Sequence, residues 1–198
     1  FSSSYGALHS HCVVRSQPHP LKDLVLEQLR VALTGRYVPD RVLGYGSTAS
    51  VYLAHDIKHD RQVAIKALRM HLEDPAAGER FVREIRYLGQ LQHPHILPLF
   101  DSGDALGIPY FVTSYVEGQT LRERLKIAPH NRFPLGETTR IAREVADSLV
   151  YAHARNILHR DIKPENLLIL DEHALVCDFG IGRAIQLAGE TELTDTGV

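Results

Sequence analysis

The stretch Leu158-His159-Arg160-Asp161-Ile162-Lys163-Pro164-Glu165-Asn166-Leu167, followed at short range by Asp178-Phe179-Gly180, decides the fold of this chain. Apolar runs flank the polar loop and predict short buried elements that hold it rigid. Asp161, Lys163 and Asn166 should therefore converge on one cleft. Asp178 reaches the same cleft if residues 167–170 and 174–177 form a hairpin around residues 171–173. Two carboxylates, an amide and a cation around one point suit a Mg²⁺–phosphate complex, because Mg²⁺ prefers hard oxygen ligands.

These residues resemble the catalytic loop and the metal-binding signature of the protein kinases, H-R-D-x-K-x-x-N and D-F-G, in the same order. D-F-G alone carries little information, but the ten-residue loop together with the upstream motifs below is a specific signal. The resemblance runs from Arg36 to the end of the chain and points to the bacterial eukaryotic-like serine/threonine kinases. It implies an α+β, bilobal fold. The small lobe holds an antiparallel β-sheet with helix C, and the large lobe is mainly helical.

Composition and periodicity divide the chain up to residue 35, and the resemblance implies the division after it. We expect a disordered leader at 1–20, an amphipathic helix at 21–35, the small lobe at 36–112, the hinge at 113–118 and part of the large lobe at 119–198. The sequence begins at Phe1 and ends at Val198, before the A-P-E motif and the further helical region that kinases carry. We therefore expect a truncated catalytic domain that is inactive by itself, with exposed apolar surface.

Composition excludes several classes of protein. The 198 residues can bury one sizeable core, and the net charge of −2 argues against nucleic acid or an anionic membrane as the main partner. Cys12 and Cys177 show no pairing pattern, which favours a reducing, cytoplasmic compartment. No apolar run has the 18 or more residues that a membrane span needs. Membrane anchoring through a segment outside this sequence stays open.

The N-terminal 20 residues are rich in Ser, His and Pro and show no periodicity, which predicts the disordered leader. His9, His11 and Cys12 could be metal ligands, but nothing downstream completes a set of four, so a solvated tail is the preferred interpretation. Apolar residues at positions 21, 24, 25, 29 and 32 then predict a helix with Gly35 as its C-cap. This helix packs on the small lobe or binds a partner.

The run from Leu43 to Tyr52, L-G-Y-G-S-T-A-S-V-Y, resembles the kinase glycine-rich loop G-x-G-x-x-G-x-V. Glycines let a strand–turn–strand backbone approach phosphates, so that its N–H groups can donate to them. Ala49 replaces the third glycine, which should tighten the loop without abolishing binding, and Val51 should cover the adenine ring. A plain β-hairpin is the alternative.

Val63-Ala64-Ile65-Lys66 resembles the V-A-I-K strand of the kinases. A lysine on a largely buried strand is costly unless it is paired. The resemblance implies that Lys66 contacts the α- and β-phosphates and pairs with Glu84 on the next helix, which Asp74-Pro75 begins. The alternative is a surface glutamate paired with Arg80. Leu88, Leu99, His159 and Phe179 match the apolar column that couples the lobes of active kinases.

Residues 108–118 resemble the last small-lobe strand and the hinge, whose backbone at Ser114, Tyr115 and Val116 should bind the adenine edge. Thr113 takes the gatekeeper position, where a small side chain leaves a back cavity open, although a plain β-branched strand residue is an equivalent interpretation. Thr120-x-x-Glu123 predicts a capping box at the start of a short helix.

From about residue 136 to 155, the apolar stripe Ile141, Val145, Leu149 and Ala152 predicts a long amphipathic helix that leads to the catalytic loop. After Gly182 the chain turns polar and resembles an activation loop. The phosphorylation candidates there are Thr191, Thr194 and Thr196. Arg160 would grip the phosphate bidentately. A mobile hydrophilic linker is the alternative before phosphorylation.

The resemblance assigns a role to each site residue. Asp161 orients the substrate hydroxyl and accepts its proton, Lys163 neutralises the γ-phosphoryl group, and Lys66 with Glu84 holds the phosphates. Asn166 and Asp178 hold the metal, Mg²⁺ or alternatively Mn²⁺. Cys177 is interpreted as a small core residue on the cavity floor and secondarily as a reactive thiol. The residues assigned to ATP are Leu43, Gly44, Tyr45, Gly46, Ser47, Thr48, Ala49, Val51, Ala64, Lys66, Thr113, Ser114, Tyr115, Val116 and Leu168.

The expected activity is transfer of the γ-phosphoryl group of ATP to Ser or Thr hydroxyls of protein substrates. The lysine two residues after Asp161 carries the preference for Ser or Thr, by resemblance only. A dimer that phosphorylates itself in trans is compatible with this function. Two alternatives remain: a nucleotide-binding pseudokinase or scaffold, and a small-molecule phosphotransferase. The first is disfavoured because each catalytic position carries a competent residue. The second is disfavoured because those enzymes typically lack the Arg160 and Lys163 pattern.

Overall fold

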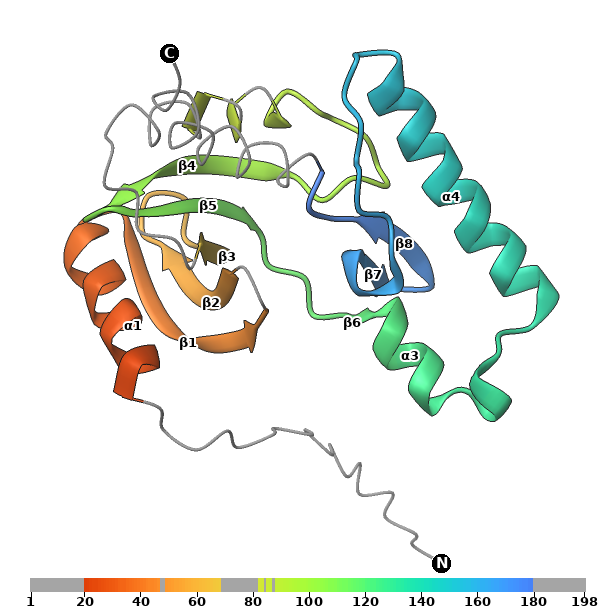
Figure 1. Ribbon diagram of the computed structural model, residues 1–198, viewed down its shortest axis with the longest axis horizontal. Coiled ribbons are helices and arrows are strands. Elements are labelled where there is room, and N and C mark those ends of the chain that lie inside the picture. Colours follow the sequence, from red (N-terminus) through yellow and green to blue (C-terminus); the bar gives the residue numbers. More distant parts are fainter. Residues whose placement is uncertain (1–19, 47–48, 69–81, 84, 87, 180–198) are drawn as a thin grey trace, which may run out of the picture.

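Two β-sheets lie on either side of a central junction in the computed structural model, which describes residues 20–46, 49–68, 82–83, 85–86 and 88–179 (Figure 1). The larger sheet has five antiparallel strands in the order β1-β2-β3-β5-β4. The strands are β1 (Tyr37–Tyr45), β2 (Ala49–Asp56), β3 (Arg61–Leu68), β4 (Leu99–Ala105) and β5 (Ile108–Ser114). The smaller sheet has the order β6-β7-β8, with β6 (Gln119–Thr120), β7 (Leu167–Leu170) and β8 (His173–Val176).

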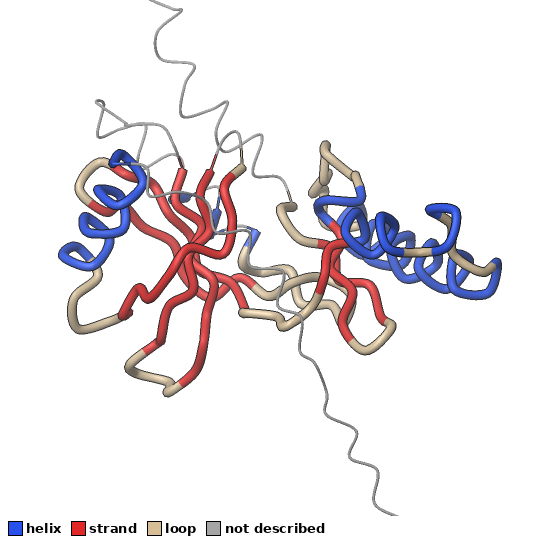
Figure 2. The backbone as a smooth tube through the Cα atoms, turned by 90° about the horizontal axis from the view of Figure 1, so that it is seen from below, coloured by secondary structure: helices blue, strands red, loops and turns tan. Residues whose placement is uncertain are grey.

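The layers follow one another along the molecule: helix α1 (Pro20–Ala32), the five-stranded sheet, the small sheet and helix α4 (Leu135–His153) (Figure 2). Helix α3 (Leu121–Ile127) and a 3-10 turn (Pro129–Asn131) connect β6 to α4, and a second 3-10 turn (Pro164–Asn166) precedes β7. The bilobal α+β fold expected from the sequence is therefore confirmed. Among the described residues, no helix is both long and apolar enough to cross a membrane.

Alternation along β3 separates the core of the small lobe from the cleft. Val63, Ile65 and Ala67 are buried in a cluster with Leu29 and Leu33, on the side of the sheet that α1 covers. Successive side chains of a strand point to opposite faces. Ala64 and Lys66 therefore face away from α1, toward the junction with the second lobe.

The predicted apolar face of the first helix is partly wrong. Leu24 is 55% exposed and Ala32 is also exposed, whereas Leu33, just past the end of α1, is buried beside Leu29. The reason is the turn that ends the helix. Gly35 has φ = +82°, and Tyr37 N–H donates to the Leu33 carbonyl (3.0 Å), so the last turn directs Leu33 inward. The helix packs on the small lobe, as one of the two interpretations expected.

The hairpin that carries the catalytic motifs is present, with β8 starting one residue earlier than predicted. Its connection is a two-residue loop, Asp171-Glu172, with φ values of +46° and +71°. Two left-handed residues match the twist of adjacent antiparallel strands, and this turn fixes the register of β7 on β8. Leu167 therefore pairs with Val176, and the chain leaves β8 directly into Cys177 and Asp178.

Two helical predictions also agree with the structure. At the start of α3, the Thr120 hydroxyl accepts the N–H of Glu123 (3.1 Å), and the Glu123 carboxylate accepts the N–H of Thr120 (2.8 Å), which forms a capping box. Helix α4 buries Ile141 and Ala152, with Val145 and Leu149 half-buried on the same face. It also buries Glu144, which the sequence analysis did not single out.

Candidate nucleotide and metal site

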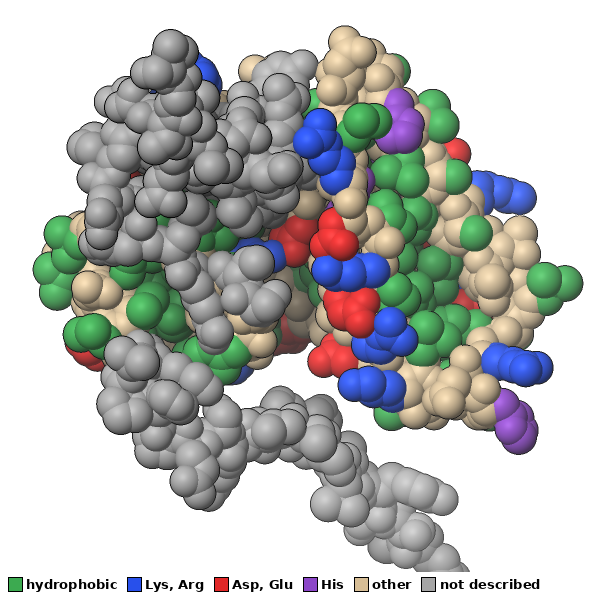
Figure 3. Space-filling view, viewed as in Figure 1, with side chains coloured by type: hydrophobic (Ala, Val, Ile, Leu, Met, Phe, Trp, Pro, Cys, Tyr) green, Lys and Arg blue, Asp and Glu red, His purple; other side chains and the backbone are tan. Residues whose placement is uncertain are grey.

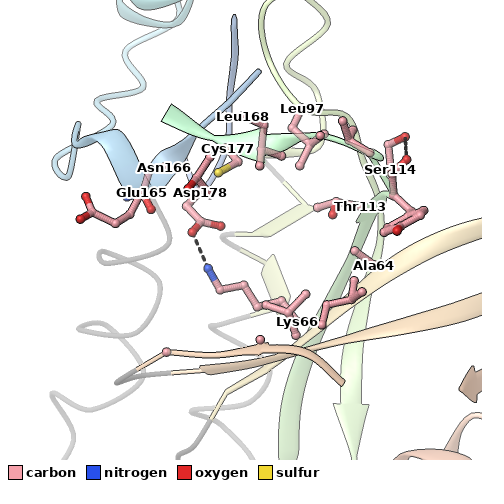
Figure 4. Close-up of a pocket in the computed structure, with 18 of the residues that line it drawn as sticks. Ala64, Lys66, Leu97, Thr113, Ser114, Glu165, Asn166, Leu168, Cys177 and Asp178 are labelled. Atoms are coloured by element: carbon pink, nitrogen blue, oxygen red, sulfur yellow. Dashed lines mark hydrogen bonds and ion pairs between the residues drawn. The ribbon is translucent and has the colours of Figure 1, made fainter. Parts of the chain in front are cut away.

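A cavity of about 680 Å³ lies at the junction of the lobes and receives side chains from both sheets (Figure 4). Lys66 enters from β3 and Thr113 from β5, while Asn166, Leu168 and Asp178 enter from the opposite lobe. The predicted residues that line it are Leu43, Gly44, Gly46, Ala49, Val51, Ala64, Lys66, Thr113, Ser114, Tyr115, Val116, Asp161, Lys163, Asn166, Leu168, Cys177 and Asp178. Segments separated by more than a hundred positions in the sequence therefore share one chamber.

Some predicted residues do not line the cavity. Tyr45 is half-buried in β1 and is not part of the lining. Other predictions lie outside the described residues: Ser47 and Thr48 of the glycine-rich loop, Glu84, the Asp74-Pro75 helix start, the leader up to residue 19, and Thr191, Thr194 and Thr196. The same holds for Arg80 and for the candidate ligands His9, His11 and Cys12.

The lining also contains residues that sequence reasoning missed: Leu97, Phe111, Glu117, Gly118, Thr120, Glu123 and Glu165. Phe111 was within reach, since it lies two positions before Thr113 and so shares its face of β5. Gly118 approaches β7 so closely that a Cβ there would lie 2.6 Å from the Ile169 carbonyl oxygen. The glycine at the end of the hinge therefore permits the contact between the connecting strand and the second lobe. No sequence pattern around Leu97 predicted that it would line the cavity.

The Lys66 ammonium and the Asp178 carboxylate form an ion pair across the cavity, 112 positions apart in the sequence (Figure 4). The side chains are 22% and 23% exposed, so both charges are mostly removed from water. An unpaired charge in such a place would be costly, and the pair satisfies both groups. Lys66 thus points at the carboxylate predicted to hold the metal.

The catalytic-loop side chains bind one another. The Asp161 carboxylate accepts the Lys163 ammonium at 2.6 Å and the Asn166 amide nitrogen at 3.0 Å. The bond from Lys163 holds the pKa of Asp161 below its usual value, and that same bond raises the pKa of Lys163. Asp161 is therefore ionised at neutral pH, as an acceptor for a hydroxyl proton must be.

Asn166 is oriented by two bonds from its amide nitrogen, one to the Asp161 carboxylate and one to the Asp161 carbonyl at 2.8 Å. Because the amide nitrogen makes both of these bonds, the amide oxygen of Asn166 can bind another partner. With the Asp178 carboxylate, it forms a pair of hard oxygen donors on the cavity wall, the type that Mg²⁺ prefers. Among the residues the structure describes, no group of three or more His, Cys, Asp or Glu is arranged as a metal site. A metal would therefore need further oxygens, which nucleotide phosphates and water supply.

His159 connects the catalytic loop to the segment that follows β8 and leads to Asp178. Its Nε2 donates to the Cys177 carbonyl (2.8 Å), and its Nδ1 accepts the Asp161 N–H (3.3 Å). These roles require the neutral tautomer protonated on Nε2, and burial lowers the pKa of His159 in agreement. The imidazole also meets the Phe179 ring edge-on, with centroids 4.6 Å apart.

A second cavity, of about 30 Å³, lies behind the first and contains three members of the predicted apolar column, Leu88, Leu99 and Phe179. Thr113 lines both cavities. The threonine side chain is thus part of the wall between the main chamber and the space behind it. Ser114 N–H donates to the Pro98 carbonyl (3.2 Å), so this N–H is not available to an adenine ring.

Cys177 lies on the cavity lining beside Asp178. Burial raises the pKa of its thiol to about 12, and the neighbouring Asp178 charge acts in the same direction. A neutral thiol is a poor nucleophile, so Cys177 behaves as a small core residue at neutral pH.

Charged side chains also gather along the side of the large lobe that faces the five-stranded sheet, where acidic and basic groups alternate (Figure 3). On this lobe Arg122 Nε contacts the Glu165 carboxylate at 2.7 Å, which ties α3 to the catalytic loop. Both side chains are about half exposed, so solvent screens the pair and it contributes little to stability.

Comparison with known proteins gives a consistent result. The family model described as "Protein kinase domain" matches residues 37–197. The chain is 41% identical over 169 residues to "Probable serine/threonine-protein kinase SCO3848" of Streptomyces coelicolor, an alignment that covers 80% of this chain and 24% of the relative. It is 40% identical over 168 residues to "Serine/threonine-protein kinase PrkC" of Bacillus subtilis, covering 83% and 25%. The chain thus spans about a quarter of the length of these relatives.

Among solved structures, the kinase domain of Mycobacterium tuberculosis PknI superimposes with a TM-score of 0.65 at 33% identity. The alignment covers 74% of this chain and 60% of that one. The region that the family model matches contains every strand of the five-stranded sheet and the hairpin that presents Asp178, since both lie within residues 37–197.

Proposed function

The chain belongs to the protein kinase family, which uses ATP with a divalent metal ion, and on that premise we propose that it transfers the γ-phosphoryl group of Mg²⁺-bound ATP to Ser or Thr hydroxyls of proteins in bacterial signalling. The observation that carries the proposal is the Lys66–Asp178 ion pair inside the chamber that Asp161 and Asn166 also line. A cation that can bind phosphate and two oxygen groups that can hold a metal, gathered in one chamber, support the binding of one metal–nucleotide.

The hard oxygen donors Asp178 and Asn166 would hold the Mg²⁺ ion, which neutralises the charge of the phosphates when bound. Nearby, Lys66 would contact the phosphates, with Glu84 as its partner in the active arrangement. Leu43, Val51, Ala64 and Leu168 would enclose the adenine ring, and the backbone of the hinge would bind its edge. The glycine-rich loop would cover the phosphates. Support for this arrangement is the shared lining of one chamber.

Phosphoryl transfer depends mainly on positioning and charge neutralisation, with little covalent work for the protein. Asp161 would orient the acceptor hydroxyl and take its proton, which fits a carboxylate held ionised by Lys163 and Asn166. Lys163 would then stabilise charge on the transferring group. The names of the relatives, serine/threonine kinases, support Ser or Thr as acceptor.

Regulation by phosphorylation is the finer part of the proposal. Thr191, Thr194 and Thr196 are the candidate acceptors, and Arg160 is the candidate phosphate ligand. Arg160 is exposed, so its guanidinium can reach a partner from another segment. Phosphorylation in trans within a dimer and a cytoplasmic location belong to the same proposal.

The test is Asp161→Asn in the intact protein. We expect a loss of about 10²–10⁴-fold in transfer from [γ-³²P]ATP, because a positioned base contributes about that much, with ATP affinity nearly retained. Asp171→Asn is the matched control, since it makes the same change on the exposed β7–β8 turn, at a left-handed position that Asn tolerates. Unchanged turnover in Asp161→Asn would remove Asp161 from this role. No transfer by the wild-type protein, with nucleotide binding intact, would favour a pseudokinase.

A further inference from the structure

Glu144 is a buried carboxylate that the proposed reaction does not use. It projects from the middle of α4 and is 7% exposed. Its Oε1 lies 2.6 Å from Nδ1 of His173, and its Oε2 accepts the N–H of Ala174 at 2.7 Å. Burial alone would raise the pKa of Glu144, but the bonds from Ala174 and His173 outweigh burial and hold this pKa below its usual value. Glu144 is therefore an ionised group with two fixed partners on β8.

The partners of Glu144 belong to the outer edge of β8, the edge that does not face β7. Four backbone groups point outward there, and each is bonded. Ala174 N–H donates to Glu144, and Ala174 C=O accepts from Nδ1 of His95 (3.0 Å). Val176 N–H donates to the His95 carbonyl (2.9 Å), and Val176 C=O accepts the N–H of Leu97 (2.9 Å). At Val176, backbone groups of residues 95 and 97 bond to this edge. At Ala174, the side chains of Glu144 and His95 bond to it.

Strand β8 delivers the metal-site carboxylate. Two residues beyond the strand the chain reaches Asp178, with φ = +65°. Between them, Cys177 donates its N–H to the Asn166 carbonyl (3.0 Å) and accepts from His159 through its own carbonyl (2.8 Å). A shift of β8 along β7 would therefore displace Asp178 relative to Asn166. A one-residue slip would also turn every β8 side chain to the opposite face.

We propose that Glu144 is a positioning residue for the metal site: by holding the outer edge of β8 through Ala174 and His173, it fixes the strand that places Asp178 opposite Asn166. The inference rests on the proposed function, because it takes Asp178 and Asn166 as metal ligands. Groups bonded directly to metal ligands commonly change metal affinity or activity by about 10–100-fold when they are altered, and Glu144, which acts through the strand, should lie at the lower end of that range.

The other ionisable groups around Glu144 do not make its contact with the β8 backbone through a carboxylate. His173 and His95 present imidazoles whose ring centroids lie 6.2 Å apart, and the His93 ring lies 5.7 Å from that of His95. Asp147, one turn further along α4, acts on His93 electrostatically. Of these groups, only Glu144 is a carboxylate bonded to the β8 backbone.

The variant that removes both contacts is Glu144→Leu, which places an apolar side chain at a buried position. Glu144→Gln keeps an oxygen for Ala174 N–H and an amide that can donate to neutral His173. Leu29→Ala serves as a destabilised control, because it opens a cavity in the small-lobe core, where Leu29 packs away from β8. All three are prepared in the intact protein and compared with Asp178→Asn.

The decisive readout is nucleotide binding, measured by calorimetry with ADP in the presence and absence of Mg²⁺. Mg²⁺ increases the affinity for ADP by some factor, which is here called the Mg²⁺ gain. We expect Glu144→Leu to lower this Mg²⁺ gain by about tenfold. Affinity without Mg²⁺ should stay unchanged, Glu144→Gln should restore most of the gain, and Leu29→Ala should keep it. Hydrogen exchange at the Ala174 amide should accelerate in Glu144→Leu, because this N–H has lost its acceptor.

Three outcomes would overturn the inference: a full Mg²⁺ gain in Glu144→Leu, an equal loss in Leu29→Ala, or a loss of Mg²⁺-free binding as large as the Mg²⁺-dependent loss. If Glu144→Leu does not fold, Glu144→Asp decides, because its carboxylate is one methylene shorter and cannot reach both partners. An unchanged Mg²⁺ gain there contradicts the inference. A full Mg²⁺ gain in Asp178→Asn would instead contradict the proposed function itself.

Discussion

Replacing Lys66 by Met separates the contribution of the ion pair to stability from its contribution to phosphoryl transfer. Lys66 bonds to Asp178, and both side chains are about one-fifth exposed. A charge-assisted bond contributes about 1.5–3 kcal/mol, and the substitution also leaves Asp178 unpaired, so with residual solvent screening we expect a loss of roughly 2–4 kcal/mol here. For a domain of this size, 1 kcal/mol corresponds to about 2–4 °C in melting temperature. The variant should therefore stay folded at 25 °C.

The variant should also lose most of its activity. Lys66 is the cation from the small lobe that would contact the phosphates, and removing one such preorganised group costs about 10²–10³-fold in rate. The assay pairs thermal unfolding with [γ-³²P]ATP transfer on the same preparation of the intact protein. Lys58→Met is the matched control, because it makes the same substitution on the exposed β2–β3 turn.

Two results would refute this reasoning. Transfer that stays within about threefold of wild type would show that Lys66 does not act on the phosphates. A fall in melting temperature well beyond about 16 °C would show that the lost rate reflects unfolding, because losing the ion pair and leaving Asp178 unpaired cannot account for so large a change.

Three further predictions concern residues in and around the chamber. Thr113→Met should narrow access to the cavity behind Thr113. Inhibitors that occupy this cavity should bind about tenfold more weakly or worse, because overpacking costs about 1–3 kcal/mol, whereas the affinity for ATP should be retained. An equal loss of ATP affinity would contradict this. Because burial lowers the pKa of His159, its contribution to stability should be complete above about pH 6.5 and fall as the pH drops through its folded pKa. His159→Phe should remove that part of the pH dependence in urea unfolding from about pH 7.5 down to about pH 5.5, and an unchanged slope would count against a neutral buried imidazole. Cys177, with a pKa of about 12, should resist iodoacetamide at about pH 8 in the folded protein, as followed by peptide mass spectrometry; rapid alkylation would indicate an exposed thiolate.

Local patterns in the sequence were sufficient for the elements that depend on neighbouring residues. The capping box needs only Thr120 and Glu123 at the right spacing, and the β7–β8 hairpin needs two apolar runs around a short polar turn. The alternation in β3 likewise predicts which side of the strand Lys66 occupies. These features are determined within a few residues, so the sequence alone could predict them.

Contacts between distant segments were harder to predict. The apolar face predicted for α1 included Ala32, but the turn at Gly35 buries Leu33 and leaves Ala32 exposed. Glu144 lies three positions after Ile141 and one before Val145, so its place on the buried face of α4 was visible in the sequence. Its partner His173 lies 29 positions away, and no local pattern joins the two. The family resemblance predicted which distant segments meet at the chamber. The spacing of apolar residues could not predict this.

The central claim is that Lys66, Asp161, Asn166 and Asp178 surround one metal–nucleotide. A crystal structure of the intact protein with Mn²⁺ and a non-hydrolysable ATP analogue tests it most directly, because Mn²⁺ gives an anomalous signal that locates the metal. The account predicts an anomalous peak bound by Asp178 and Asn166, with a phosphate oxygen within hydrogen-bonding distance of the Lys66 ammonium. A peak bound by other residues, or triphosphate density outside this chamber, would contradict it.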